Sequence, residues 1–201
     1  MTSLKSIATA STAVLVLTAL GGGAFAVSRP EPVRPAQSTA NAAISAQEHA
    51  RTIAAMKPPT RSRPVIAIIG DNDGAETTDF LIPYAVLKDS AAAEVLALAS
   101  GEGPLKLQPA LTIRPDATTA QFDARYPDGA DYVIVPAIVD HDDPRIVAWV
   151  QAQAGKGATI VAVCAGSLTL SAAGLLKDRA ATGHWYDAEG LRKANPGMTW
   201  V

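Results

Sequence analysis

Residues 159–167 read TIVAVCAGS and decide the fold. The first five form a continuous run of strand-forming, mostly apolar residues, which is typical of a strand buried on both faces of a parallel sheet. This run leads directly into Cys164, and the small residues Ala165 and Gly166 permit a sharp turn into a helix over 165–174. We therefore predict a strand–turn–helix unit with a cysteine at the turn.

The same alternation extends through the chain towards its N-terminus. Apolar runs that end in turn residues predict strands, and an acid followed by proline marks a helix start near residue 142. We predict strands at 65–70, 94–99, 131–136 and 159–163, helices at 78–88 and 142–155, and a variable region at 101–128 with short strands at 105–107 and 111–113. The second strand, rich in alanine and leucine, could equally be helical. Strands that alternate with helices indicate an α/β fold with a doubly wound parallel sheet.

The first 28 residues have the composition of a targeting segment. Lys5 supplies a positive start, the apolar block 13–20 follows, and Ala24-Phe25-Ala26 has the small-x-small form of a signal-peptidase site. The uncharged run is also just long enough, at about 20 residues, for an uncleaved membrane anchor. We expect an exported protein whose residues 1–28 are a cleaved signal peptide or an anchor. An anchor would contact the membrane through residues 7–28.

Residues 29–63 are rich in proline and alanine and are interpreted as a linker, with a helix over 39–56. The remaining residues, 64–201, form the predicted globular domain. Residues 197–201 read as the start of another strand, and a sheet that ended there would leave unpaired backbone. We therefore expect the domain to be incomplete at its C-terminus.

Composition narrows the classes of partner. Of the 201 residues, 48 % are apolar and 18 % are charged, which fits a globular domain with an apolar leader. The net charge of −2 and the scattered basic residues offer no surface for nucleic acid. A single cysteine cannot form an intrachain disulfide, so Cys164 is either a free thiol or one half of an intermolecular bridge.

Cys164 lies where ligands bind in sheets of this kind, beyond the carboxyl end of a strand. A helix that starts at the cysteine favours negative charge, which predicts a lowered thiol pKa. The Ala165 N–H is then the natural donor to an oxyanion. The alternative is a small apolar residue with no chemical role. Spacing alone leaves both interpretations open.

Two longer stretches resemble a known family. Residues 161–167, VAVCAGS, and 172–185, AAGLLKDRAATGHW, closely resemble the ThiJ/PfpI family, which has a flavodoxin-like, class I glutamine amidotransferase-like fold with helices on both faces of the sheet. They are most similar to the branch that contains isonitrile hydratases and the sensor domains of AraC-type regulators. Residues 74–80, followed by Pro83-Tyr84, look like the first loop and helix of that branch.

The resemblance assigns roles to individual residues. It implies that Cys164 is the nucleophile or a redox-sensitive thiol, that Asp79 bonds or exchanges a proton with its sulfur, and that His184 lies near the site. It also implies an oxyanion site at the Ala165 and Gly166 backbone. Without it, Asp79 reads as a solvated acid at a helix start and His184 as an ordinary imidazole. A carboxylate beside a thiol makes a pair that titrates as one unit.

The chain departs from the family pattern at two positions. Pro136 is followed by Ala137-Ile138-Val139 where the family usually has Gly-Gly, whose amides help to form an anion pocket. Ala165 stands where the protease-like branch has histidine, which argues against a cysteine–histidine peptidase.

Three other features suggest no function of their own. Residues 140–143 read DHDD, which suggests a metal site. Adjacent side chains rarely converge on one ion, however, and a helix cap with solvated neighbours explains these residues more simply. We therefore expect no metal and no cofactor. We interpret Trp149 and Trp185 as packing residues.

The sequence therefore favours an exported or membrane-tethered domain with a nucleophilic cysteine, acting as a hydrolase, hydratase or lyase on a small molecule. The alternative is a non-catalytic ligand- or redox-sensing domain, although no helix-turn-helix is visible in these residues. The expected partner is a small molecule, and a homodimer is left open.

Overall fold

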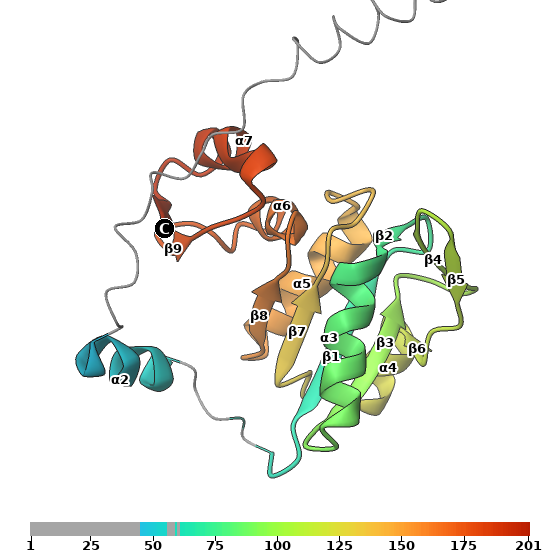
Figure 1. Cartoon of the computed structure of the whole chain (residues 1–201). Helices are drawn as coiled ribbons and strands as arrows, with labels where there is room; N and C mark the ends of the chain where they lie inside the picture. Colours follow the sequence, from blue (N-terminus) through green and yellow to red (C-terminus); the bar gives the residue numbers. More distant parts are fainter. Residues whose placement is uncertain (1–44, 56–58, 60) are drawn as a thin grey trace, which may run out of the picture. The chain divides into compact units, whose positions relative to one another are not determined.

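The computed structural model describes residues 45–55, 59 and 61–201 (Figure 1). The predicted signal peptide or anchor, 1–28, lies outside these residues, as does most of the predicted linker. Helix α2 (Ala46–Ala55) falls within the helix expected over 39–56. Among the helices of the described residues, none combines the length and apolarity needed to span a membrane.

The domain is built around a five-stranded sheet in the order β6-β3-β1-β7-β8, in which all pairings are parallel. Its strands are β1 (Val65–Gly70), β3 (Glu94–Ala99), β6 (Ala117–Thr118), β7 (Tyr132–Val135) and β8 (Thr159–Ala162). Every residue of the central strand β1 is buried. The predicted doubly wound parallel sheet is confirmed, including the strand expected over 94–99.

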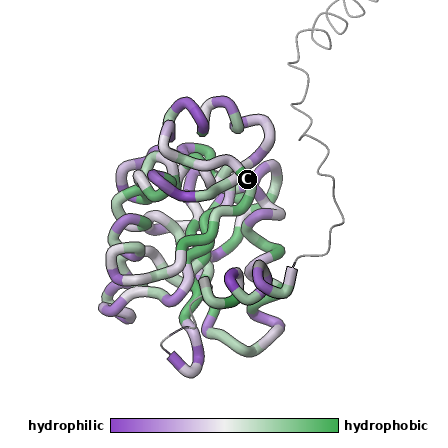
Figure 2. The backbone as a smooth tube through the Cα atoms, turned by 90° about the vertical axis from the view of Figure 1, so that its left-hand side faces the viewer, coloured by the Kyte–Doolittle hydropathy of each residue, from purple (hydrophilic) through white to green (hydrophobic). Residues whose placement is uncertain are grey.

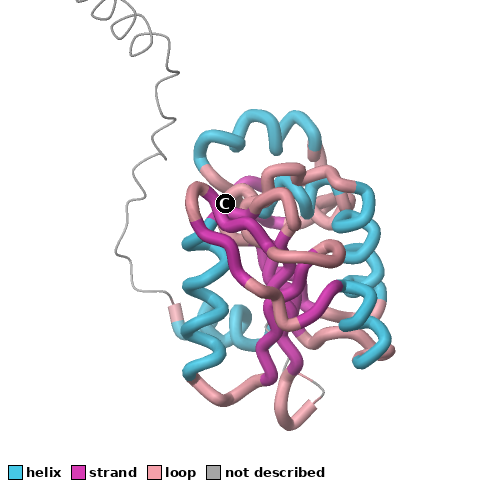
Figure 3. The backbone as a smooth tube through the Cα atoms, turned by 90° about the vertical axis from the view of Figure 1, so that its right-hand side faces the viewer, coloured by secondary structure: helices cyan, strands magenta, loops and turns pink. Residues whose placement is uncertain are grey.

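Helices cover both faces of this sheet (Figure 3). They are α3 (Thr77–Asp89), α4 (Thr119–Arg125), α5 (Pro144–Gly155) and α6 (Gly166–Ala172). A 3₁₀ turn, η1 (Trp185–Asp187), and α7 (Ala188–Ala194) follow, and α7 packs against α6. Successive side chains of a strand point to opposite faces. Accordingly Ile68 packs with Phe80 of α3, whereas Ile69 joins the core that contains Trp149 of α5. In Figure 2 the green of hydrophobic residues is concentrated in these strands.

Two small sheets flank the central one. β2 (Ala75–Glu76), β4 (Leu105–Gln108) and β5 (Leu111–Ile113) form the first, and β9 (Ala180–Ala181) pairs in parallel with β10 (Thr199–Trp200) in the second. The short strands expected at 105–107 and 111–113 are β4 and β5, an antiparallel pair. The strand start expected near residue 197 is β10.

Some local predictions need correction. Helices α4 and α7 were not predicted, and α6 ends at Ala172 instead of near 174. Trp149 is a packing residue: it is 7 % exposed, and its ring lies edge-on to that of Phe122, with 5.7 Å between the ring centroids. Trp185 is 49 % exposed, so its interpretation as a packing residue is wrong. Its ring lies 5.3 Å from that of His184, within its own segment.

The N-terminus of α5 gives a first prediction about stability. Buried Asp143 is the helix cap: its Oδ1 accepts the Arg145 N–H at 2.7 Å, and its carboxylate pairs with the Arg145 guanidinium. Because capping bonds are worth about 1 kcal/mol each, Asp143→Ala should lower the free energy of unfolding by about 1–2 kcal/mol. Denaturant titration at neutral pH measures this loss.

The same substitution has a defined pH dependence. The hydrogen bonds from Arg145 hold the pKa of Asp143 below its usual value. The stabilisation is therefore present at neutral pH and disappears as the pH falls below the ordinary aspartate pKa of about 3.9. The exposed neighbour Asp142 is the matched control, and Asp142→Ala should change stability little. Equal stabilities for wild type and Asp143→Ala at neutral pH would refute the cap.

Candidate functional site

Cys164 occupies a strained turn between β8 and α6. Its φ of +57° lies in the left-handed region, which costs a residue with a side chain about 1–2 kcal/mol. The turn is closed by the Gly166 N–H, which donates to the Val163 carbonyl at 2.9 Å, and by the Ser167 hydroxyl, which donates to the Cys164 carbonyl at 3.2 Å. The cysteine is exposed. This geometry lifts a reactive atom out of the sheet, as a nucleophile elbow does.

The turn depends on the absence of a side chain at Gly166. A Cβ atom there would lie 2.0 Å from the Val135 carbonyl oxygen and 3.0 Å from that of Pro136. The start of α6 therefore rests directly on the carboxyl end of β7. Sequence reasoning gave this glycine a role in the turn, and the packing supplies the physical reason.

Asp79, in the first turn of α3, lies beside the cysteine. The Glu76 carboxylate caps this helix by accepting the Asp79 N–H at 2.7 Å. The Asp79 Oδ2 in turn accepts the Ala137 N–H at 3.2 Å. The Asp79 carboxyl also lies close enough to the Cys164 thiol for each group to shift the pKa of the other. The fold thus brings together two of the three side chains singled out from the sequence.

The segment that replaces the family's Gly-Gly is fixed against β2. Its Ala137 carbonyl accepts the Glu76 N–H at 2.8 Å, and the Val139 N–H donates to the Gly74 carbonyl at 3.0 Å. Because the Ala137 N–H is bonded to Asp79, this amide positions the carboxyl group. An anion in the site would have to compete with Asp79 for it.

Partial desolvation is the main cause of a raised pKa for both members of the pair, although the Cys164 residue as a whole is exposed and Asp79 is half-buried. For the Cys164 thiol, the negative charge of Asp79 raises the pKa further and the Ala165 N–H opposes the rise. For Asp79, the Ala137 N–H opposes the rise and the charge of Glu76 adds to it. The expected lowering of the thiol pKa is therefore wrong. Helix α6 has only seven residues, and two carboxylates lie close by.

This electrostatic arrangement defines the resting state of the site. Two interacting acids share their protons as a unit. The carboxyl group is ordinarily much the stronger acid, so Asp79 gives up its proton first and Cys164 keeps its own to higher pH. Such a thiol becomes a strong nucleophile only if its proton leaves as it reacts.

Glu76 is a residue of the candidate site that the sequence reasoning missed. Burial raises its pKa, but hydrogen bonds from the Asp79 N–H and from Thr78 outweigh this effect and leave the pKa lowered. An ionised Glu76 therefore faces Asp79 and makes it harder to ionise. The signal in the sequence was its spacing: an acid three residues before Asp79 is placed to cap that helix start.

His184 makes its polar contacts within its own segment. It caps η1, where its Nδ1 accepts the Tyr186 N–H at 3.4 Å and lies 3.9 Å from an Asp187 carboxylate oxygen. The preceding residue, Gly183, lies against α6, since a Cβ there would be 2.5 Å from the Ser167 Oγ. The segment therefore adjoins the helix that follows Cys164, while a role for the imidazole stays a prediction.

The oxyanion donors also stay predictions. The Ala165 N–H is directed at the Cys164 sulfur, and the Gly166 N–H is bonded to Val163. In the acidic stretch 140–143, the neighbouring Asp142 raises the pKa of Asp140. Within residues 45–55, 59 and 61–201, no group of three histidine, cysteine or acidic side chains is placed to hold a metal.

A groove of about 650 Å³ runs along the edge strand β8. It is lined by Ala162 and Ser167, which precede and follow the cysteine turn, and by the apolar side chains of Ile160 and Leu170, while Cys164 itself is not among the lining residues. A volume of this size accommodates a small organic molecule.

The family model described as DJ-1/PfpI matches residues 64–201. A search of curated proteins gave no match. The chain is similar to a two-domain protein of Anabaena variabilis with DJ-1/ThiJ/PfpI-like and ferritin-like domains, at 26 % identity and a TM-score of 0.58, covering 68 % of this chain and 40 % of that one.

Two further structures have the same fold. A ThiJ/PfpI family protein of Pseudomonas syringae is 25 % identical with a TM-score of 0.57, covering 68 % of this chain and 56 % of that one. A ThiJ/PfpI domain protein of Brachyspira murdochii is 12 % identical with a TM-score of 0.59, covering 70 % of this chain and 80 % of that one. The chain thus spans less than two thirds of the Anabaena and Pseudomonas proteins.

Proposed function

The chain belongs to the DJ-1/PfpI family, and on that basis we propose that its domain, residues 64–201, acts on a small molecule as a cysteine-dependent hydrolase, hydratase or lyase. One observation carries the proposal: an exposed cysteine held at φ +57° has beside it a carboxyl group, Asp79, whose pKa is raised and which interacts with the thiol. Perturbed acids that face a strained nucleophile are typical of catalytic sites.

The proposed reaction begins with the neutral thiol. As the Cys164 sulfur attacks an electrophilic carbon, the S–H bond breaks, its proton moves to Asp79, and the new C–S bond forms. The electron pair displaced from the carbon moves to the neighbouring heteroatom, which takes up the proton from Asp79. Water then replaces the sulfur on that carbon and returns a proton to the thiol. The raised pKa of Asp79 suits both transfers, since it makes the carboxylate a better base.

The Ala165 N–H is the backbone group proposed to receive the developing negative charge, because it already faces the sulfur. The groove beside β8 is the proposed path for the substrate. His184 is proposed as a peripheral member of the site, supported by the contact of its segment with α6.

The Asp79–Cys164 pair is tested by the pH dependence of alkylation. In Asp79→Asn the neighbouring negative charge is gone, so the pKa of Cys164 should fall. The rate of alkylation by iodoacetamide near neutral pH should then rise about 3-fold or more. A thiolate of lower pKa is a weaker nucleophile, but the increase in the fraction of thiolate outweighs this loss. The rate is followed by mass spectrometry across pH 6 to 10.

The matched control is Asp89→Asn, an exposed acid at the other end of α3, which should leave the alkylation profile unchanged. If Asp79→Asn left the profile where the wild type has it, the two groups would not be coupled and the proposed proton transfer would fail.

A second candidate function is a non-catalytic ligand- or redox-sensing domain. The raised pKa of Cys164 favours a ligand-binding domain, since a neutral thiol at rest is a weak nucleophile. It disfavours redox sensing, because oxidation of a cysteine also proceeds through the thiolate. Sensing predicts binding of a small molecule or reversible oxidation of Cys164 without turnover.

We further propose that the protein is exported, or tethered by its N-terminal segment, on the support of the residue pattern over 1–28. Mass spectrometry of the mature protein tests this directly. Loss of residues 1–26 supports a cleaved signal, an intact N-terminus in the membrane fraction supports an anchor, and an intact N-terminus in the cytosol contradicts both.

A further inference from the structure

A second cavity, of about 550 Å³, lies beside the edge strand β6. Its walls come from the loop that follows β3 (102–104), the segment 112–118 and the first turn of α4. Its volume is in the range of small-molecule sites, about 300–1,000 Å³. Cys164 follows β8, which β7 and β1 separate from β3. With strands about 4.8 Å apart, the cavity lies about 14 Å or more across the sheet from the elbow.

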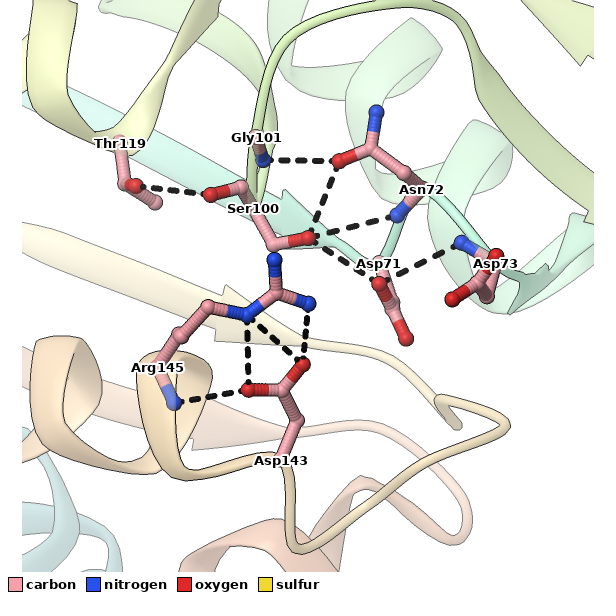
Figure 4. Close-up of polar contacts among 8 residues, drawn as sticks. All are labelled: Asp71, Asn72, Asp73, Ser100, Gly101, Thr119, Asp143 and Arg145. Atoms are coloured by element: carbon pink, nitrogen blue, oxygen red, sulfur yellow. Dashed lines mark hydrogen bonds and ion pairs between the residues drawn. The ribbon is translucent and has the colours of Figure 1, made fainter.

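The loop wall of this cavity is held in place by polar contacts at the carboxyl end of β1 (Figure 4). The Asn72 side chain accepts the Gly101 N–H at 2.7 Å and donates to the Pro104 carbonyl at 3.0 Å. The Ser100 hydroxyl lies 3.0 Å from an oxygen of the buried Asp71. The Thr119 hydroxyl, on α4, donates to the Ser100 carbonyl. The wall is therefore formed before any ligand arrives, which reduces the cost of binding.

The helix wall orients a carboxylate towards the cavity. The Gln121 Oε1 accepts the Thr118 N–H at 2.9 Å, and its Nε2 lies 3.5 Å from the Glu102 carboxylate. The other acid, Asp116, is already engaged with the Ala97 N–H at 2.8 Å and the Tyr84 hydroxyl at 3.3 Å. Both contacts of Asp116 fall on its Oδ2, and the bond from the Ala97 N–H is short, whereas Glu102 has a single, longer contact, so Glu102 is the acid more available to a ligand.

Arg114 is the only arginine or lysine among the lining residues. In the described residues, its side chain makes no hydrogen bond or ion pair. A planar guanidinium with free donors binds a carboxylate through two parallel hydrogen bonds. The cavity therefore combines an unused cation with an oriented acid.

We propose that this cavity binds a small zwitterion such as a free α-amino acid, with the ligand's carboxylate on Arg114 and its ammonium group on Glu102. The site is separate from the cysteine elbow, so it does not depend on the function proposed above. The cavity lies beside the edge strand β6 and the cysteine turn follows the other edge strand, β8, so the domain could bind two small molecules at once.

The test is calorimetric titration of the full chain with the twenty free α-amino acids. Each amino acid is compared with two analogues: the amine that lacks the α-carboxylate and the carboxylic acid that lacks the α-ammonium group. At least one amino acid should bind with a Kd of about 1 mM or tighter, and both analogues should bind at least about tenfold more weakly. Arg114→Gln and Glu102→Gln should each weaken binding by about tenfold or more.

Arg125→Gln is the matched control, because this exposed arginine of α4 pairs with Glu94 instead of lining the cavity, and it should bind as the wild type does. Cys164→Ser should also bind normally, which separates this site from the proposed catalysis. The proposal is overturned if no amino acid binds, if the carboxylic acid alone binds equally well, or if Arg114→Gln binds with unchanged affinity.

Discussion

Replacing Gly166 with alanine is expected to lower the free energy of unfolding by about 3 kcal/mol or more. The added Cβ would lie 2.0 Å from the Val135 carbonyl oxygen and 2.9 Å from its carbon. Both are backbone atoms of a central strand, so no side-chain rotation can relieve the contact. Either β7 or the start of α6 must therefore shift by about 1 Å. We expect this backbone shift to cost at least as much as ordinary overpacking of a core, which costs about 1–3 kcal/mol.

Thermal and denaturant unfolding measure this effect. For a domain of this size, a loss of 3 kcal/mol corresponds to a drop in Tm of about 10 °C. Because Cys164 is two residues away, the alkylation profile of any folded variant should also change, with the thiol moving away from Asp79.

Gly190→Ala is the matched control for Gly166→Ala. Gly190 lies inside α7, and a Cβ there would meet nothing within 4 Å. Alanine is the better helix former by about 1 kcal/mol, so this substitution should leave stability unchanged or raise it slightly. If both glycines tolerated alanine equally, the close packing of the elbow on β7 would be wrong.

The elbow illustrates how far the sequence could predict this molecule. The apolar runs at β1, β7 and β8 and the small residues after Cys164 are local signals, and each became the predicted element. Helix α4 was missed because seven residues within a polar region give no apolar periodicity. Its signal was the pair Thr118 and Gln121, which cap the helix reciprocally.

The electrostatics of the site could not be predicted in the same way. The prediction of a lowered thiol pKa rested on one local effect, the helix start beside Cys164. The raised pKa follows from burial and from Asp79, which a loop and a helix bring to the sulfur from 85 residues away in the chain. Glu76 matters for the same reason: its charge acts on Asp79 only because α3 begins where it does.

Replacing Cys164 with serine is expected to lower turnover by about 10³-fold or more in a protein that remains folded. Serine is close to cysteine in size, and the site is exposed, so the free energy of unfolding should change by less than about 1 kcal/mol. A hydroxyl is a far weaker acid than a thiol, so Asp79 cannot take its proton as the new bond forms. A loss of 10³-fold corresponds to about 4 kcal/mol of transition-state stabilisation.

The assay uses a panel of small electrophiles, isonitriles and α-oxoaldehydes, with product formation followed by mass spectrometry. Asp79→Asn is the informative companion. In the proposed mechanism it should lose turnover as Cys164→Ser does, yet its thiol should be alkylated faster than that of the wild type. This opposite response separates proton transfer from simple thiol reactivity, because a cysteine that needed no base would gain in both measurements. Equal turnover by wild type and Cys164→Ser would exclude the thiol as nucleophile. Ligand binding by the wild type without turnover would instead support the sensing function.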